Sequence, residues 1–227
     1  MVQPCFVVEV RGLARPTLGK KKDLEERKVL LISCDSSLVV DTLYKKAAGE
    51  NAAVACFYFN FVAQREQSPT AILGSVLKQI VGGLDGVPER IVKAFRDREK
   101  ISGGQRLALG EIVEFLQDIS SLRRTFICID ALDECPAGPR GKLLDILNQI
   151  LQGSPGTRLF LTGRPHIRAE VEKHLAGRAA TISITPTKND ITKFLQAKLK
   201  EDAMPEAMDD SLEEDIMQTI PDTFSEM

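Results

Sequence analysis

The sequence predicts an α/β fold, a three-layer sandwich in which a mostly parallel sheet lies between helices. Short apolar, β-branched segments alternate with longer segments of helical periodicity, which is the pattern of βαβ units. Several of the short segments are apolar at successive residues, as expected for strands that helices cover on both faces. The 227 residues suffice for one large domain of this kind.

The strand candidates are Phe6–Val10, Val29–Ser33, Val54–Phe61, Thr125–Asp130, Arg158–Thr162 and Ala180–Ile184. Apolar periodicity predicts helices over Leu38–Lys46, Pro69–Val81, Pro88–Arg98, Leu107–Ile119, Arg140–Leu151, Ile167–Leu175 and Lys188–Leu199. Thr187 and Asp190 form an approximate capping box before the last of these. A further helix begins near Ser211, and Pro221 should stop it.

Three regions follow from this pattern. Residues 1–28 hold one strand candidate and a basic stretch, and their role is unclear. Residues 29–186 carry the alternating strands and helices of the predicted core. Residues 187–227 form a helical continuation that ends without a folded-looking terminus.

Composition excludes several classes of protein. Hydrophobic residues make up 43% and charged residues 27%, as in ordinary globular proteins. No apolar run approaches the roughly 18 residues that cross a membrane, and the N-terminus does not resemble a secretory signal. The five cysteines include no CxxC pair, which indicates reduced thiols and a cytoplasmic location. With two Tyr, no Trp and no RNA-binding motif, we expect no nucleic-acid partner.

Charge is unevenly distributed. Residues 201–227 hold ten acidic residues and no Lys or Arg, so the first 200 residues carry a net charge of +8. A mildly basic body suits a phosphate-bearing ligand. Ordinary solvated faces and an acidic terminal helix explain the same numbers more simply.

The strongest chemical signal is a buried strand that runs into acidic residues. The segment Thr125–Ile129 is followed by Asp130, and Asp133 and Glu134 come three and four residues later. Ligands bind beyond the carboxyl ends of parallel strands. There Asp130 can hold Mg²⁺, Glu134 can act as a base that orients an attacking water, and Asp133 can support the metal or hold Glu134. A buried strand that ends in a turn with solvated acids is the plainer interpretation.

A second buried strand, Arg158–Thr162, ends in polar residues one helix later. If the two strands are neighbours, Thr162 and Arg164 lie near Asp130. An arginine there can contact a γ-phosphate through charge-assisted hydrogen bonds. A surface arginine in a strand-to-helix turn would give the same sequence.

These two segments, FICIDALDEC and TRLFLTGRPH, resemble the Walker B and sensor 1 segments of NACHT-type STAND NTPases, which have a P-loop NTPase fold. The similarity is greatest to the fungal branch with nephrocystin-like N-terminal modules, and it extends to segments 36–43, 55–61 and 68–80. The resemblance implies an intracellular switch set by Mg²⁺ with ATP or GTP, associated with ankyrin or WD40 repeats and implicated in non-self recognition and cell death. Intact NACHT proteins are the protein partners that it implies.

The phosphate-binding loop of that family is missing. A P-loop needs G-x-x-x-x-G-K-[ST] between a strand and a helix, because its backbone N–H groups and its lysine hold the phosphates. The chain from Lys28 to Ser37 contains neither a glycine nor an internal lysine. Asp35 is expected to cap the following helix. Upstream, Gly12 and Gly19–Lys20 have the wrong spacing and are expected to be a solvated connector.

Two other sites are weaker. His166, Glu170 and His174 are spaced four apart, which could bind zinc, but a solvated helix face is the expected outcome. Cys128 lies in a predicted buried strand and is expected to be a core residue.

Three functions therefore stay open. The chain is a nucleotide-dependent STAND switch with impaired nucleotide binding, or a non-catalytic, degenerate module that acts through protein partners, or an unrelated α/β hydrolase that uses Asp130, Asp133 and Glu134. Whether it hydrolyses a nucleotide is not decided by the sequence, because the Walker A lysine is absent.

Overall fold

The computed structural model describes residues 5–11, 36–60, 66–102, 106–175, 177–184, 187–200 and 209–225. Residues Cys5–Ser183 form one compact unit, and the chain from Ile184 onward belongs to another. The strand candidate Val29–Ser33, the N-cap proposed at Asp35 and the glycines at 12 and 19 lie outside the described residues. The predicted division into regions 1–28, 29–186 and 187–227 stays a prediction.

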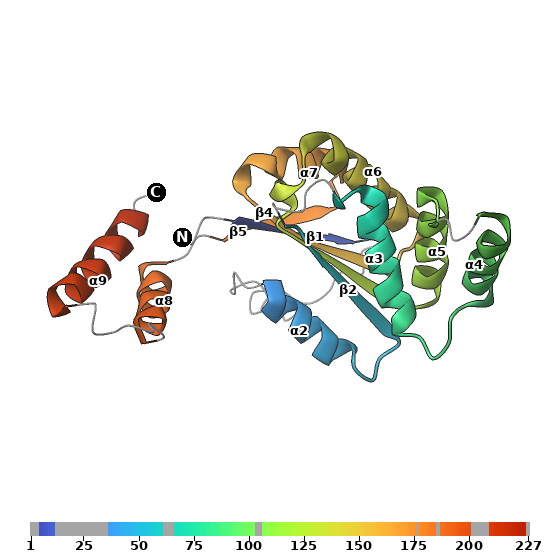
Figure 1. Cartoon of the computed structure of the whole chain (residues 1–227). Helices are drawn as coiled ribbons and strands as arrows, with labels where there is room; N and C mark the ends of the chain where they lie inside the picture. The colour runs from blue at the N-terminus through green and yellow to red at the C-terminus, as the bar shows by residue number, and fades with distance from the viewer. Residues whose placement is uncertain are drawn as a thin grey trace, which may run out of the picture. The chain divides into compact units, whose positions relative to one another are not determined.

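The described part of the chain forms a five-stranded sheet in the order β2-β3-β4-β1-β5 (Figure 1). The strands β2 (Ala52–Tyr58), β3 (Arg124–Asp130) and β4 (Thr157–Gly163) are parallel neighbours. β1 (Cys5–Arg11) lies between β4 and β5 (Ala179–Ile184). The predicted mostly parallel α/β sheet is confirmed.

β1 departs from the parallel direction. It pairs antiparallel with β4, so that Phe6 faces Gly163 and Arg11 faces Arg158. Arg11 therefore ends β1 at the edge of the sheet where the parallel strands begin. Arg11, the last described residue of β1, thus lies four residues, or about 13 Å of strand, from the level of Asp130.

Helices cover both faces of the sheet. α3 (Pro69–Gly82), α5 (Leu109–Leu122) and α6 (Ala137–Gly153) lie on one side, and α2 (Ser36–Ala47) lies on the other (Figure 1). The main core takes alternate strand residues: Ala53, Ala55, Ile127, Ile129, Leu159 and Leu161. Val54 and Cys128 are buried at the intervening positions, as are Val39 and Val40 of α2. Each fully buried Ile or Leu contributes about 1.5–3 kcal/mol.

Local sequence sets the helix ends. Ser68 precedes α3, and its hydroxyl accepts a hydrogen bond from the backbone N–H of Ala71 at 3.3 Å. Thr187 and Asp190 form the predicted capping box before α8 (Lys188–Lys200): Asp190 N–H donates to Thr187 Oγ1 at 3.2 Å, and Thr187 N–H donates to Asp190 Oδ2 at 3.0 Å.

The expectation that Pro221 stops the last helix is wrong. α9 (Asp210–Ser225) continues through Pro221, which is buried. A proline inside a helix removes one backbone hydrogen bond and costs about 3 kcal/mol, and burial of its ring offsets part of that cost. None of the described helices is long and apolar enough to cross a membrane.

Side chains cover the outer edge of β2, the last strand of the described sheet. Tyr44 Oη donates to the carbonyl of Val54 at 3.2 Å, and Arg123 donates to the carbonyl of Ala52. Gln79 of α3 makes three bonds to Cys56: its amide donates to the carbonyl at 2.8 Å, and its Oε1 accepts from the backbone N–H at 3.0 Å and from the thiol at 3.7 Å. These bonds occupy groups that an added strand would use.

Gln79→Leu should lower the free energy of unfolding by about 1–3 kcal/mol, because it leaves the N–H and C=O of Cys56 without partners. It should also make the protein self-associate through the uncovered strand edge. Urea unfolding and sedimentation velocity measure the two effects. Gln152→Leu, at an exposed position of α6, adds the same side chain without touching a strand and is the matched control. Equal behaviour of both variants would contradict the role given to Gln79.

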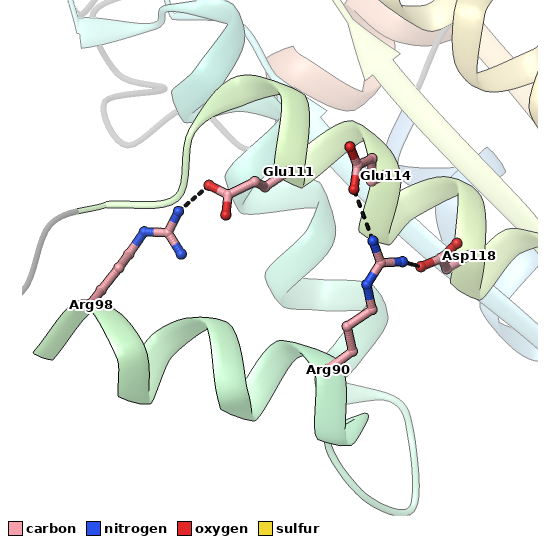
Figure 2. A network of polar contacts seen from close by, with 5 residues as sticks. All are labelled: Arg90, Arg98, Glu111, Glu114 and Asp118. Atoms are coloured by element: carbon pink, nitrogen blue, oxygen red, sulfur yellow. Dashed lines mark hydrogen bonds and ion pairs between the residues drawn. The ribbon is translucent and has the colours of Figure 1, made fainter. Parts of the chain in front are cut away.

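α4 (Glu89–Ser102) is attached to α5 by charged side chains as well as by buried Ile91. Figure 2 shows Arg90 between Glu114 and Asp118, and Arg98 at Glu111. Arg90 also lies 5.5 Å from the centroid of the Phe115 ring, which adds a cation–π contact. The Arg90 ion pairs are exposed, so each is worth only about 0.2–1 kcal/mol, whereas the Arg98–Glu111 pair is partly buried.

The double variant Arg90→Ala, Arg98→Ala should loosen α4 without unfolding the core. Hydrogen exchange over residues 89–98 should become faster, while the global unfolding free energy falls by less than about 2 kcal/mol. About 1 M NaCl should reduce the difference from wild type, since it screens charges beyond about 3 Å. The hydrogen bond from Arg98 lowers the pKa of Glu111 below 4.5, so its contribution is present above pH 4.5 and is lost as the pH falls further. Arg96→Ala on the same helix is the control. Equal hydrogen exchange in all variants would contradict the role of Arg90 and Arg98 in holding α4 against α5.

Candidate functional site

The carboxyl edge of β3 turns sharply after Asp130. Ala131 has φ 53°, the left-handed region that non-glycine residues seldom adopt. The 3-10 helix η2 (Leu132–Glu134) follows, with a hydrogen bond of 2.9 Å from the N–H of Glu134 to the carbonyl of Ala131. A left-handed alanine costs about 1–2 kcal/mol. The turn is thus held by its surroundings, and it keeps Asp133 and Glu134 beside the end of β3.

Thr162 of β4 fixes the end of β3. Its hydroxyl donates to Asp130 Oδ1 at 2.5 Å and accepts from the N–H of Ala131 at 3.0 Å. One side chain therefore orients both the carboxylate and the strained residue after it. The predicted proximity of Thr162 and Asp130 follows from the parallel neighbours β3 and β4.

Asp133 and Arg164 form a second contact at this edge. Asp133 Oδ2 lies 3.3 Å from Arg164 Nε, and Asp133 Oδ1 accepts from the backbone N–H of Arg164 at 3.2 Å. The Asp133 side chain is 7% exposed and that of Arg164 is 55% exposed. Asp133 is thus enclosed, with its oxygens turned to the loop after β4. Arg164 reaches solvent beside the site.

Tyr58 of β2 lies beside Asp130 at the same edge of the sheet. It is the register partner of Asp130 on β2. Burial, with Cys56 and Asp130 nearby, raises the pKa of Tyr58 to about 12. The phenol therefore stays neutral at physiological pH and can donate a hydrogen bond at this edge.

Arg140 supports the acidic turn from behind. Its Nη1 donates to the carbonyl of Cys135 at 2.7 Å and to that of Asp133 at 3.5 Å, and its Nε and Nη2 contact Glu170 Oε2 at 2.9 and 2.8 Å. Arg140 is a buried cation at 8% exposure. It links η2, α6 and α7 (Arg168–His174) through one guanidinium.

The sequence did not single out Arg140, although a signal was present. The buried residues of α6 include Leu143, Leu144 and Leu147, and Arg140 lies one turn before them on the same stripe. A charged residue on an apolar stripe needs a buried partner. Tyr58 could not be found in this way, because its place beside Asp130 depends on strand register.

The zinc arrangement does not form. Glu170 is bound to Arg140, and His174 Nδ1 lies 2.7 Å from Asp145 Oδ1 on α6. Across the parts of the chain that the structure describes, no three His, Cys, Asp or Glu side chains converge on a metal position. The expectation of a solvated helix face holds only in part, because Glu170 is bound to the buried Arg140 and His174 is partly enclosed beside Asp145.

The donors at the β3 edge fit magnesium better than a transition metal. Asp130 and Thr162 offer hard oxygen atoms, which magnesium prefers. Magnesium is often held by one or two carboxylates, with water and substrate phosphates completing its shell, so a set without three protein ligands suits it. Asp130 is the residue that would hold the ion.

The structure is thus an α/β module of parallel strands covered on both faces, with carboxylates, a hydroxyl and an arginine at the carboxyl edge where such folds place their ligand sites. The chain belongs to the family described as Nephrocystin 3, N-terminal, whose family model matches residues 33–164, more than half of the 227 residues. No curated protein matches the sequence.

One similar solved structure is that of the Aeropyrum pernix ORC1 protein in complex with DNA. The identity is 18% and the TM-score is 0.44, and the match covers 82% of this chain and 51% of that chain. The chain thus spans about half the length of ORC1. At this TM-score the likeness carries no argument about function.

Arg140→Met should lower the free energy of unfolding by about 2–3 kcal/mol, because it leaves Glu170 and two carbonyls without their donor. The variant Arg140→Met, Glu170→Met should recover part of that loss, since it removes both buried charges. Urea unfolding of the four proteins of the double-mutant cycle measures the coupling. Lys142→Met, exposed on the same helix, is the control. Additive effects would contradict the link between Arg140 and Glu170.

Proposed function

We propose that the chain is the NTPase-type module of a NACHT-like STAND signalling protein of the fungal kind, with impaired nucleotide binding. Its activity as a switch would depend on Mg²⁺ with ATP or GTP, in the cytoplasm, with intact homologous NACHT proteins or other proteins as partners. Membership of the nephrocystin-like family supports this proposal. The observation that carries it is the hydrogen bond of 2.5 Å between Thr162 and Asp130 at the carboxyl edge of two parallel strands.

In this proposal each residue at the edge has one task. Asp130 accepts from Thr162 with one carboxylate oxygen, and its second oxygen would hold Mg²⁺, directly or through water. The ion would neutralise phosphate charge when bound. Glu134 would orient an attacking water, and Arg164 would contact the terminal phosphate with guanidinium nitrogens beyond the Nε that faces Asp133.

Asp133 acts through Arg164 in this arrangement. Its enclosed carboxylate binds both the backbone and the guanidinium of Arg164, which favours a positioning role over direct metal binding. Positioning of Arg164 thus takes the place of the two roles expected from the sequence, which were support of the metal and positioning of Glu134. It also explains how an arginine that is more than half exposed can be held near the site.

A non-catalytic regulatory module is the second candidate, and the direction of β1 favours it. β1 has its first residues at the Asp130 edge and its last described residue, Arg11, at the opposite edge, whereas a strand that leads into a phosphate loop beside Asp130 would run in the other direction. Each charged hydrogen bond that a phosphate loop would supply is worth about 1.5–3 kcal/mol. The loss of several such bonds is enough to abolish binding.

Titration calorimetry with Mg-ATP and Mg-GTP decides between the two candidates. The NTPase module should bind one of them with a micromolar dissociation constant, and Asp130→Ala should weaken binding at least tenfold because it removes the metal ligand. Asp97→Ala, on the exposed face of α4, should bind as wild type does. Absence of binding at millimolar nucleotide would refute the switch and support the regulatory module.

A further inference from the structure

Two cysteines lie opposite each other on neighbouring strands. Cys56 of β2 and Cys128 of β3 are direct register partners in the parallel ladder. Adjacent strands are about 4.7–4.9 Å apart, and disulfides join Cα atoms about 4.4–6.8 Å apart. Paired residues point to the same face of a sheet. The Cα spacing of the ladder therefore lies within the range that a disulfide joins. The bond needs a Cβ separation of about 3.5–4.5 Å, so the two strands must approach slightly, and the Cys56 thiol must turn away from Gln79 Oε1, which lies 3.7 Å from its Sγ.

The surroundings of the pair allow one thiol to meet a reagent. Both cysteines line a shallow surface hollow that encloses no space for a water molecule, with Val40 of α2 and Phe160 of β4 at its sides. Cys128 is buried at 4% exposure, whereas Cys56 is half-buried. Cys56 is thus the accessible thiol and Cys128 the enclosed one.

The third described thiol, Cys135, is separate from the pair. It is a buried residue of the main core, on the other face of the sheet from Cys128. It supplies an internal reference with the same chemistry and no thiol opposite it in the ladder.

We propose that Cys56 and Cys128 are the site of a reversible cross-strand disulfide, which forms when the protein meets hydrogen peroxide. The Cys56 thiolate attacks the peroxide, whose O–O bond breaks, so that a sulfenic acid forms and water leaves. The Cys128 thiolate then attacks the Cys56 sulfur, forms the S–S bond and releases a second water. The two thiols lose two electrons in total, and hydrogen peroxide takes them up with the two thiol protons.

The hollow makes this reaction slow at neutral pH. Burial raises the pKa of Cys56, the thiol that attacks the peroxide, and a hydrogen bond from Tyr58 offsets part of that rise. The titratable groups near the pair are Tyr44 of α2, Tyr58 of β2 and Asp130 of β3, and none of them is a cation that would stabilise a thiolate strongly. The rate should therefore rise about tenfold per pH unit between pH 7 and 9.

The disulfide would change the geometry of the carboxyl edge of the sheet, where Asp130 lies. Cys56 and Cys128 lie two residues before Tyr58 and Asp130 on their strands, so the two pairs are neighbours on the same face of the sheet. Drawing the two strands together there shifts the carboxylate of Asp130 relative to Thr162. This consequence rests on the proposed function, whereas the disulfide itself does not.

Peptide mass spectrometry tests the bond directly. The purified protein is treated with hydrogen peroxide at pH 7 and pH 8.5, quenched with N-ethylmaleimide under denaturing conditions, and digested without reduction. The expected product is a peptide that joins Cys56 to Cys128, two hydrogens lighter than the two thiol peptides, formed faster at the higher pH and removed by dithiothreitol. Cys135 should be recovered as the alkylated thiol.

Two variants control the result. Cys135→Ser should leave the linked peptide unchanged, and Cys56→Ser should abolish it. Recovery of Cys56 as sulfinic acid in wild type, a bond between two chains, or a different pair in the linked peptide would overturn the proposal. The linked peptide and the oxidation state of Cys56 are measured on the wild-type protein, so the test is decisive even if a variant does not fold.

Nucleotide titration of the oxidised and reduced proteins separates this proposal from the previous one. Oxidation should weaken Mg-nucleotide binding at least threefold. If neither form binds nucleotide, the NTPase proposal fails, and the linked peptide still decides whether the disulfide forms.

Discussion

The pairing of β3 with strands on both sides is the constraint on which the rest of the domain depends. β3 is bonded to β2 and β4 along its length, and its core positions Ile127 and Ile129 have no exposed surface. A backbone that is paired on both edges and enclosed on both faces cannot shift without breaking buried hydrogen bonds. The carboxylate that follows such a strand is therefore held at a defined point, whatever the loop beyond it does.

Two acidic residues close to one edge repel each other, and the protein offsets this locally. A hydroxyl donates to Asp130, a guanidinium and an N–H face Asp133, and the buried Arg140 adds a cation behind the turn. These contacts stabilise the edge in the absence of any ligand. An incoming polyphosphate must compete with them for Arg164 in particular, so the same interactions that preserve the geometry reduce the gain on binding.

The sequence was sufficient for the features that depend on local pattern. The apolar segments before Asp130 and Thr162 predicted buried parallel strands, and their neighbouring positions brought Asp130, Thr162, Asp133 and Arg164 together. The direction of β1 was not predictable, because an apolar strand has the same composition whichever way it runs. The sequence also did not specify the register between β2 and β3, which decides that Tyr58 pairs with Asp130 and Cys56 with Cys128. The prediction that the last helix stops at Pro221 was wrong, because a helix can accommodate a proline whose ring is buried.

Stability and ligand binding are separable in this arrangement. The buried core is formed by α3, α5, α6 and the odd-numbered positions of the strands, and none of Asp130, Thr162 or Arg164 belongs to it. Loops beyond the strands are surface features whose loss costs binding energy but little packing energy. A chain without a phosphate loop can therefore keep the complete α/β core and the acidic edge. The intact Asp130 edge therefore follows from the folding of the α/β core. The affinity for a nucleotide depends on the loops beyond that edge and is a separate property.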